Sequence, residues 1–315
     1  NDALQIIPKI PTIYDEPFAD ESQIPTTLIS EFSSRSVKVC LSGDGGDELF
    51  CGYNRYLAGP KIWKLIKILP PILRKFISRF IYYFPISSWD NFYKFFKAVI
   101  PNYLQINNPG IKIHKISNIL NAETIYELYL CLISSWQDSN EILIDKRDKF
   151  NQAQFLFTSK EKMDLQHQMM LMDAKGYLPN DILVKTDRAS MSSSLETRMP
   201  MLNHKLIEFA WSIPLSMKMR GNRSKWILRQ VLNKYLPKKI YQGPKSGFAV
   251  PIGDWLRGPL REWAEDLIDP NLIYSQNFFH SEHINKKWKE HISGKRDWSS
   301  QLWTILMFQS WLIEN

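Results

Sequence analysis

The sequence predicts an α/β fold that is predominantly helical and contains little β-strand. Most apolar side chains recur every three or four residues, as on helices with one buried face, up to the tryptophan-rich C-terminal segment. One short apolar run, residues 37–41, has the length of a buried strand. It stops at a loop, residues 42–48, that holds three glycines and three carboxylates. In open α/β sheets ligands bind where strands end, so this loop is the first candidate for a functional site.

The composition is that of a folded protein. Of the 315 residues, 44% are hydrophobic and 13% aromatic, which is enough for a core and excludes wholesale disorder. That length allows one large domain or two smaller ones. A formal net charge of +8 could attract nucleic acid, anionic lipid or nucleotide phosphate. Because Lys and Arg are scattered among apolar positions, we assign most of them to solvated helix faces and expect no nucleic-acid binding.

The N-terminal part of the chain carries the strand and its loop. Residues 1–20 contain three prolines and predict an extended lead-in. The polar side chains of Asp20-Glu21-Ser22 predict the start of a helix over 24–34. The buried strand at 37–41 and the acidic loop follow.

Residues 57–135 predict helices joined by irregular connectors rich in proline and asparagine. Within them, residues 61–84 carry Lys and Arg at helical spacing and are interrupted by Pro70-Pro71, which predicts two amphipathic basic helices. No apolar stretch is long enough to span a bilayer, so we expect no stable membrane insertion. Binding to a membrane surface would suit such helices. Packing against the rest of the protein explains the same pattern and is preferred.

The second half of the chain predicts further helices. Residues 152–176 show a helical pattern whose methionines suit an adaptable core. The glycines and prolines of residues 243–259 predict a loop. Three more helices are expected, each with a polar residue at its start: 203–211 with Asn203, 224–235 with Ser224, and 297–313 with Asp297.

The three cysteines, Cys40, Cys51 and Cys131, are odd in number and lack metal-ligand spacing. Neither a disulfide framework nor a zinc site is therefore expected. Cys40 lies in the apolar run and is assigned to the core. Cys51 directly follows the acidic loop, where a nucleophile or an inert residue would both fit. Unpaired cysteines suit a reducing compartment, and we expect a cytoplasmic protein.

Three blocks of the sequence form motifs. Residues 42–56 read SGDGGDELFCGYNRY, residues 177–191 read YLPNDILVKTDRASM, and residues 244–251 read PKSGFAVP, followed by Trp255. In this order they resemble SGDGGDELFxGYxRY, YLPxDxLxKxDRASM and KxGFxxPxxxW of the glutamine-hydrolysing asparagine synthetase family. Cys51 occupies the first position written x in this resemblance, where the family has glycine, which favours an inert substitution there.

The resemblance implies the adenine-nucleotide α-hydrolase-like (PP-loop ATP pyrophosphatase) fold. Residues 1–315 would be a partial synthetase domain, because no SGGxDS pyrophosphate loop and no glutaminase segment occur in them. Residues 1–56 would be a remnant of the nucleotide-binding α/β part, and residues 57–315 a mainly helical lobe. We expect the isolated chain not to turn over ATP, because half of the phosphate cradle would be missing.

The resemblance assigns roles to the acidic loop. Ser42 and Gly43 would present a hydroxyl and backbone groups to the nucleotide. Asp44, where many family members have glutamate, would act in acyl-adenylate formation or in deprotonating ammonia. Asp47 would be a second catalytic group that binds Mg²⁺ or the amino group of the substrate. A tight turn with a solvated acidic face is the plainer alternative, and it explains the clustering of glycines and carboxylates less well.

Two basic residues complete the predicted site. Lys245, in the GPKSGF loop, would be catalytic by meeting the charge that develops on pyrophosphate. A solvated loop lysine is the alternative. Arg188 would bind substrate or phosphate, and a structural ion pair fits the sequence equally well.

The implied reaction converts aspartate, ATP and glutamine-derived ammonia into asparagine, AMP and pyrophosphate through a β-aspartyl-adenylate. ATP and Mg²⁺ are the expected cofactors. The expected partners are these small molecules and an N-terminal glutaminase domain in the parent chain, and a homodimer is left open. Two alternatives remain: a related adenylating enzyme acting on another acid, such as a β-lactam-forming synthetase or an amidotransferase, and a basic binding module without chemistry.

Overall fold

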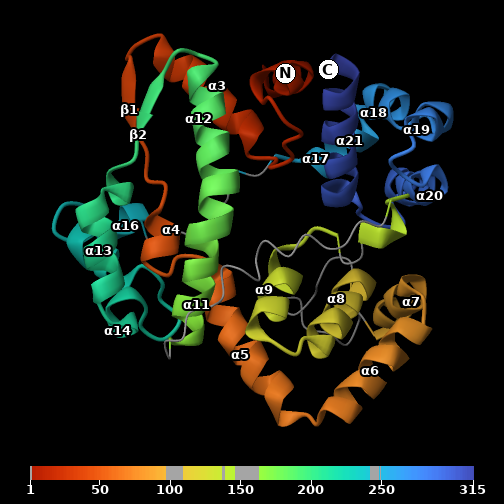
Figure 1. Cartoon of the computed structure of the whole chain (residues 1–315), viewed down its shortest axis with the longest axis horizontal. Helices are drawn as coiled ribbons and strands as arrows, with labels where there is room; N and C mark the ends of the chain where they lie inside the picture. The colour runs from red at the N-terminus through yellow and green to blue at the C-terminus, as the bar shows by residue number, and fades with distance from the viewer. Residues whose placement is uncertain (1, 97–108, 137–138, 146–162, 242–247, 249) are drawn as a thin grey trace.

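The computed structural model describes residues 2–96, 109–136, 139–145, 163–241, 248 and 250–315. Over these residues the chain is mainly helical, as the sequence predicts, with one sheet of two strands. Figure 1 shows this sheet beside the ends of α3 (Gln23–Ser34) and α12 (Leu183–Met191). The sheet and these two helices support the acidic loop.

The sheet pairs β1 (Val39–Leu41) with β2 (Glu196–Arg198) in parallel, with Val39 opposite Glu196 and Leu41 opposite Arg198. The prediction of a buried strand is wrong for β1, because Val39 and Leu41 are 48% and 74% exposed. Among the described residues β1 has one neighbouring strand, so part of its apolar surface has no layer packed over it.

Residues 2–13 form short helical turns, so the predicted extended lead-in is wrong. The turns are α1 (Asp2–Ile6), the 3-10 helix η1 (Ile7–Lys9) and α2 (Ile10–Ile13). Pro8 and Pro11 lie in first turns, where the missing N–H breaks no helical hydrogen bond. Ile6, Ile7 and Ile10 are buried and hold these turns against the core.

A long helix runs through the middle of the molecule (Figure 1). It consists of α11 (Leu165–Met172), the π-helical stretch η4 (Asp173–Ile182) and α12. Pro179 lies inside the π-helical stretch, where its missing N–H cannot join an α-helical ladder. The prediction of a methionine core is confirmed by the buried Met169, Met170 and Met172. The predicted helical residues 152–162 lie outside the described residues.

In the part of the chain that the structure describes, three clusters of buried side chains join the elements. The first combines the N-terminal turns and α3 with the C-terminal helices. The second joins α5, α8, α9 and α11, and the third joins α4 with α13 and α15. The bounds of these elements are α4 (Gly46–Leu49), α5 (Asn54–Ile68), α8 (Pro109–Asn121), α9 (Ile125–Ile133), α13 (His204–Ser212), α15 (Trp226–Leu232), α17 (Ile252–Arg257), α18 (Arg261–Leu267), α19 (Pro270–Gln276), α20 (Ser281–Ile292) and α21 (Ser299–Glu314).

The two predicted basic helices are confirmed as α5 and α6 (Pro71–Tyr83), which are separated at Pro70. They are followed by α7 (Ile86–Phe96). In the described part of the chain, no helix combines the length and the apolar character needed to cross a membrane. The remaining short elements are η3 (Ser139–Glu141), η5 (Pro200–Leu202), α14 (Leu215–Lys218) and α16 (Lys238–Tyr241).

Of the helix starts predicted in the second half of the chain, one is the N-cap residue itself and two lie one residue before it. Asn203 is confirmed as the N-cap of α13, where its side chain accepts from the Lys205 N–H. The cap of α15 is Lys225, not Ser224, because the chain turns there through a left-handed conformation. Asp297 lies one residue before the N-cap of α21 and accepts from the Ser299 N–H. The prediction of a loop over 243–259 is wrong for Ile252–Arg257, which form α17.

Candidate active site

The acidic loop leaves β1 with the parallel pairing still intact. The Ser42 N–H donates to the Arg198 carbonyl at 2.8 Å, and the chain then turns into α4. Gly45 makes this turn with a φ of +87°, and a Cβ there would lie 2.3 Å from Leu202 Cδ2. Only glycine fits such a position. A Cβ at Gly43 would meet no described atom within 4 Å, so the backbone at Gly43 is open to a ligand.

The Asp44 carboxylate is oriented by two hydroxyl groups. Ser42 Oγ donates to Asp44 Oδ2 at 2.6 Å, and Thr186 Oγ1 donates to the same oxygen at 3.0 Å. The Asp44 N–H donates in turn to Ser42 Oγ at 3.3 Å. Thr186 belongs to α12, so the long helix fixes the loop that follows β1.

Asp47 forms an ion pair with a lysine from a distant segment. Lys225 Nζ lies 3.1 Å from Asp47 Oδ2. The backbone N–H of Lys225 donates to the Phe50 carbonyl at 3.2 Å, which anchors the lysine beside the loop. A Cβ at Gly52 would lie 2.0 Å from Asp47 Oδ1 and 2.4 Å from Lys225 Cε. The glycine at position 52 is therefore what allows the two side chains to meet.

The other two reactive groups of the loop region point into the protein. Glu48 is 1% exposed and accepts from the Tyr53 hydroxyl at 2.6 Å, and burial raises the pKa of its carboxyl. Cys51 is fully buried with a φ of +58°, and burial raises the pKa of its thiol to about 12. A thiol with such a pKa is not poised as a nucleophile. The left-handed backbone is a conformation that glycine adopts without strain.

A cleft of about 530 Å³ opens over the loop, and Ser42, Asp44 and Asp47 line it together with Lys185 and Thr186. The cleft therefore combines carboxylates, hydroxyls and one ammonium group, and the open backbone at Gly43 lies between two of its lining residues, Ser42 and Asp44. Backbone N–H groups and a cation can bind phosphate, and an oriented carboxylate can accept a proton. This is a chemically versatile set for a ligand that carries both phosphate and an ionisable nitrogen.

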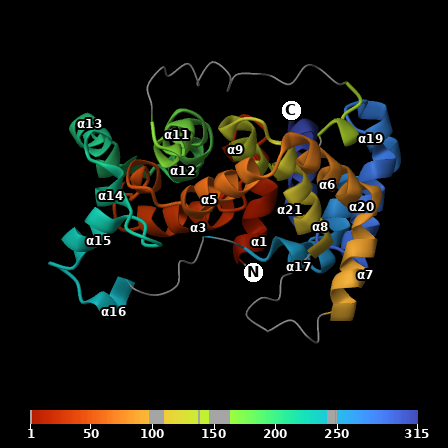
Figure 2. The same ribbon diagram turned by 90° about the horizontal axis from the view of Figure 1, so that it is seen from below.

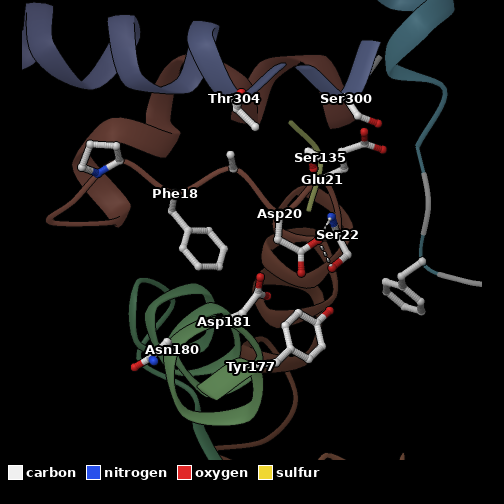
Figure 3. A pocket seen from close by; sticks show the side chains of 13 residues that line it. Phe18, Asp20, Glu21, Ser22, Ser135, Tyr177, Asn180, Asp181, Ser300 and Thr304 are labelled. Carbon is white, nitrogen blue, oxygen red and sulfur yellow. Dashed lines mark hydrogen bonds between the residues drawn. The ribbon is translucent and has the colours of Figure 1, made fainter. Parts of the chain in front are cut away.

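A second cavity, of about 590 Å³, adjoins the cleft, since Ser22 and Phe248 line both. Figure 3 shows the Asp20 and Asp181 carboxyl groups pointing toward one another in it. Lys185 Nζ forms an ion pair with Asp20 at 2.7 Å and donates to Ser22 Oγ at 2.8 Å. Asp20 also accepts from the Ser22 N–H at 2.9 Å and from its hydroxyl at 2.8 Å.

Two of the acids that line this cavity, Asp20 and Asp181, have opposite pKa shifts. Burial disfavours the charge on Asp20, but the Lys185 ammonium and the Ser22 hydrogen bonds outweigh it and hold the pKa of Asp20 below its usual value. Burial, and then the charge on Asp20, raise the pKa of Asp181 to about 7. Neighbouring carboxyl groups separated in this way hold one proton between them over a wide pH range.

This separation predicts a pH-dependent stability. A carboxyl whose pKa rises on folding holds a proton that the unfolded chain releases, so Asp181 lowers the free energy of unfolding as pH rises from about 4 to about 7. The slope from one such group is at most about 1.4 kcal/mol per pH unit. In denaturant unfolding measured across this range, Asp181→Asn should remove the contribution, whereas Asp164→Asn at an exposed site should not. A slope that Asp181→Asn leaves unchanged would refute the shift.

The structure brings together four of the six predicted site residues. Ser42, Gly43 and Asp44 lie in the loop after β1 and Asp47 in the first turn of α4, and all of them except Gly43 line the cleft. Lys245 lies outside the described residues. Arg188 forms an ion pair with Asp15 at 2.5 Å and is not among the cleft-lining residues, so its binding role stays a prediction.

Sequence reasoning missed Thr186 and Lys225. Thr186 lies within the predicted YLPxDxLxKxDRASM block at one of its variable positions, so the block itself gave a weak signal for it. Lys225 follows the loop by more than 170 residues and belongs to no predicted motif.

Comparison with known proteins identifies the family. The family model described as asparagine synthase matches residues 1–313. The chain belongs to the asparagine synthase family. The loop, the cleft and the long helix described above are thus features of an asparagine synthase domain.

Relatives of this asparagine synthase domain are longer proteins. Asparagine synthetase [glutamine-hydrolyzing] 1 of Bacillus subtilis is 27% identical over 97% of this chain and 45% of its own length. A putative asparagine synthetase [glutamine-hydrolyzing] of Mycobacterium tuberculosis is 28% identical over 97% of this chain and 44% of its own length. Amidase chyE of Penicillium rubens is 23% identical over 80% of this chain and 38% of its own length. The chain spans less than half the length of these relatives.

Proposed function

We propose that the polypeptide containing this chain catalyses ATP-dependent amide-bond formation, with aspartate as the acceptor acid. Asp44 carries the proposal: its carboxylate is oriented by Ser42 and Thr186 in a cleft at the end of a parallel strand, within an asparagine synthase domain. Such a group is what the second half of the reaction requires. The products are asparagine, AMP and pyrophosphate.

In the first step, an oxygen of the aspartate side-chain carboxylate attacks the α-phosphorus of ATP. The bond from that phosphorus to the bridging oxygen breaks, pyrophosphate leaves, and a β-aspartyl-adenylate forms. The Ser42 hydroxyl and the open backbone at Gly43 would contact the nucleotide phosphates. Lys185, which lines the cleft, would offset part of the charge that gathers as two anions meet. Lys245 and Arg188 keep their predicted roles toward pyrophosphate and phosphate.

In the second step, ammonia attacks the acyl carbon and AMP leaves with the electron pair of the broken carbon–oxygen bond. The nitrogen must lose a proton, and Asp44 would accept it. A fixed carboxylate is effective here because no free energy is needed to orient it when the proton is transferred. We include in the proposal that ammonia comes from glutamine, hydrolysed by an N-terminal glutaminase domain in the cytoplasm.

Mg²⁺ would bind at Asp47, as the resemblance implies. Among the described residues, no three acidic, histidine or cysteine side chains gather to hold a metal by themselves. Two carboxylates of one cleft, Asp44 and Asp47, nevertheless fit the way Mg²⁺ binds, with one or two protein carboxylates plus phosphate and water. Bound there, the ion would neutralise phosphate charge. Asp47 would then contact both the ion and the Lys225 ammonium group.

A second acceptor class is a bulkier acid. The observation that favours it is the second cavity, which adjoins the cleft and at about 590 Å³ exceeds it in volume. An acid that extends into this cavity would present an amine or another cation to Asp20 and Asp181. A related adenylating amidotransferase would use the same loop chemistry on such an acid.

The proposal is tested with the intact polypeptide, ATP, Mg²⁺ and glutamine or ammonia. Formation of AMP, pyrophosphate and asparagine that depends on aspartate would support it. AMP formation with a bulkier carboxylic acid but without amidation of aspartate would favour the second acceptor class. If the folded protein cleaved no nucleotide with any carboxylic acid tested, both acceptor classes would be contradicted. A basic binding module without chemistry would then be the remaining alternative.

A further inference from the structure

One face of helix α6 packs on α8, and a different face carries exposed apolar side chains. Ser78 and Ile81 are buried on the side of α8. On the other side Ile72, Phe76, Phe80 and Tyr83 are 84%, 66%, 51% and 81% exposed, respectively. Spacings of four, four and three residues place these four side chains on one stripe along the helix. Among the described residues, nothing covers this stripe.

The stripe continues onto the neighbouring helices. Phe80 packs on Trp89 with ring centroids 6.4 Å apart, Trp89 on Phe92 at 6.4 Å, and Phe92 on Phe96 at 4.8 Å. On α5, Leu65 and Ile68 are exposed one helical turn apart. Figure 1 shows α5, α6 and α7 along one edge of the molecule. Figure 2 shows the molecule from below, the side on which α5 and α6 meet. We define the α5–α7 face by its exposed apolar residues: Leu65, Ile68, Ile72, Leu73, Phe76, Phe80, Tyr83, Phe92, Phe95 and Phe96.

The same segment is basic and contains no acid. Residues 49–89 hold no Asp or Glu, and their basic residues are Arg55, Lys61, Lys64, Lys67, Arg74, Lys75 and Arg79. Two arginines of this set are turned inward: Arg55 pairs with Asp173, and Arg74 donates to the Ala122 carbonyl. The five others are exposed.

Two acids next to this segment, Asp90 and Glu123, each pair with a basic residue. Asp90 of α7 pairs with Arg296 at 3.3 Å and accepts from the Gly110 N–H, so it belongs to the interior. Glu123 lies 3.6 Å from Lys75, and both are exposed. The α5–α7 face thus joins an aromatic and aliphatic surface to cations such as Lys64 and Arg79.

We propose that the α5–α7 face binds an anionic lipid surface, with α6 lying in the plane of the membrane interface. Aromatic and aliphatic side chains on one face of a helix, with basic side chains beside them, are the pattern of interfacial helices. Negative lipid headgroups would neutralise the cations while the apolar stripe leaves water. The sequence pattern favoured packing on the protein over membrane binding; in this proposal one side of α6 packs on the protein and the other faces the lipid.

Charge argues against a second copy as the occupant. A twofold contact would place this acid-free basic face against itself, and the cations would repel one another. The proposal is also independent of the proposed enzymatic function, because no residue of the α5–α7 face lines either cavity.

The test is co-sedimentation of the full chain with phosphatidylcholine vesicles, with and without phosphatidylglycerol. We expect binding to the anionic vesicles that weakens with added salt. Lys64→Glu with Arg79→Glu should lower the partition coefficient by about 30-fold or more, because each basic side chain near an anionic surface contributes about a factor of five. Ile72→Ser with Phe76→Ser should lower it by about 10-fold. These side chains are exposed, so the variants should fold.

Matched controls are Lys205→Glu with Lys289→Glu and, for the apolar pair, Tyr274→Ser, all exposed positions on other helices. They should bind vesicles as the unmodified chain does. Equal binding to neutral and anionic vesicles, or binding that the α5–α7 variants leave unchanged, would overturn the proposal. So would a chain that binds single-stranded nucleic acid but no vesicles. A chain that binds no vesicles and forms a dimer that these variants disrupt would overturn it as well.

Discussion

Asp173→Ala is expected to lower the free energy of unfolding by about 3–5 kcal/mol. Asp173 is fully buried at the junction of α11 and η4. Its carboxylate pairs with Arg55 at 2.8 Å and accepts from the hydroxyls of Tyr56 and, at 2.7 Å, Tyr129. Truncation would leave a largely buried guanidinium and two buried hydroxyls without their acceptor, and each would carry a desolvation cost.

Denaturant unfolding of the full chain, followed by far-UV circular dichroism, measures this loss. Asp164→Ala is the matched control, because Asp164 precedes the same helix with a side chain 62% exposed, and its loss should be below about 1 kcal/mol. Tyr129→Phe should fall between the two, at about 1–2 kcal/mol, since it removes one hydrogen bond to a charged group. A loss at Asp173 no larger than at Asp164 would show that the cluster does not hold α5 and α9 to the long helix.

Asp44→Asn is expected to lower the rate of amide formation by about 10²–10⁴-fold in the polypeptide that contains this chain. The substitution keeps the size of the side chain and one oxygen that can accept from Ser42 or Thr186. It removes the negative charge and the ability to take up a proton from the attacking nitrogen. The fall should appear in kcat more than in KM for aspartate, because the group acts in the transition state.

Glu196→Gln tests whether any carboxylate in the neighbourhood would give the same result. Glu196 lies on β2, is half exposed and pairs with Arg198, so its loss should change the rate by less than about 3-fold. If Asp44→Asn and Glu196→Gln were indistinguishable, Asp44 would have no chemical role. Unfolding of Asp44→Asn at the same denaturant concentration as the unmodified protein would show that a lost rate is not lost folding.

Local patterns in the sequence predicted what depends on local contacts. The loop after β1 was predicted because its glycines and carboxylates lie within a few residues of one another, and Gly45 indeed turns through a left-handed conformation. Helices α5 and α6 were predicted from their periodicity and from the proline pair between them. The cap at Asn203 followed from the chemistry of one side chain.

Contacts between distant segments could not be predicted in this way. Thr186 meets Asp44 across 142 residues, and Arg55 meets Asp173 across 118. The sequence pattern around Lys225 contains nothing that points to Asp47. The exposure of β1 depends on how many strands and helices pack against it, which a run of apolar residues does not encode. The N-terminal turns could not be predicted for the same reason, because the core that stabilises them includes α21 at the other end of the chain.

The most direct measurement of the central claim follows oxygen-18 from the side-chain carboxylate of labelled aspartate during amide synthesis by the intact polypeptide. If the cleft over the Ser42–Glu48 loop forms an acyl-adenylate, one labelled oxygen must appear in AMP, and Asp44→Asn must slow its appearance together with that of asparagine. Label recovered in inorganic phosphate alongside ADP, or transfer to AMP at an unchanged rate in Asp44→Asn, would contradict the account.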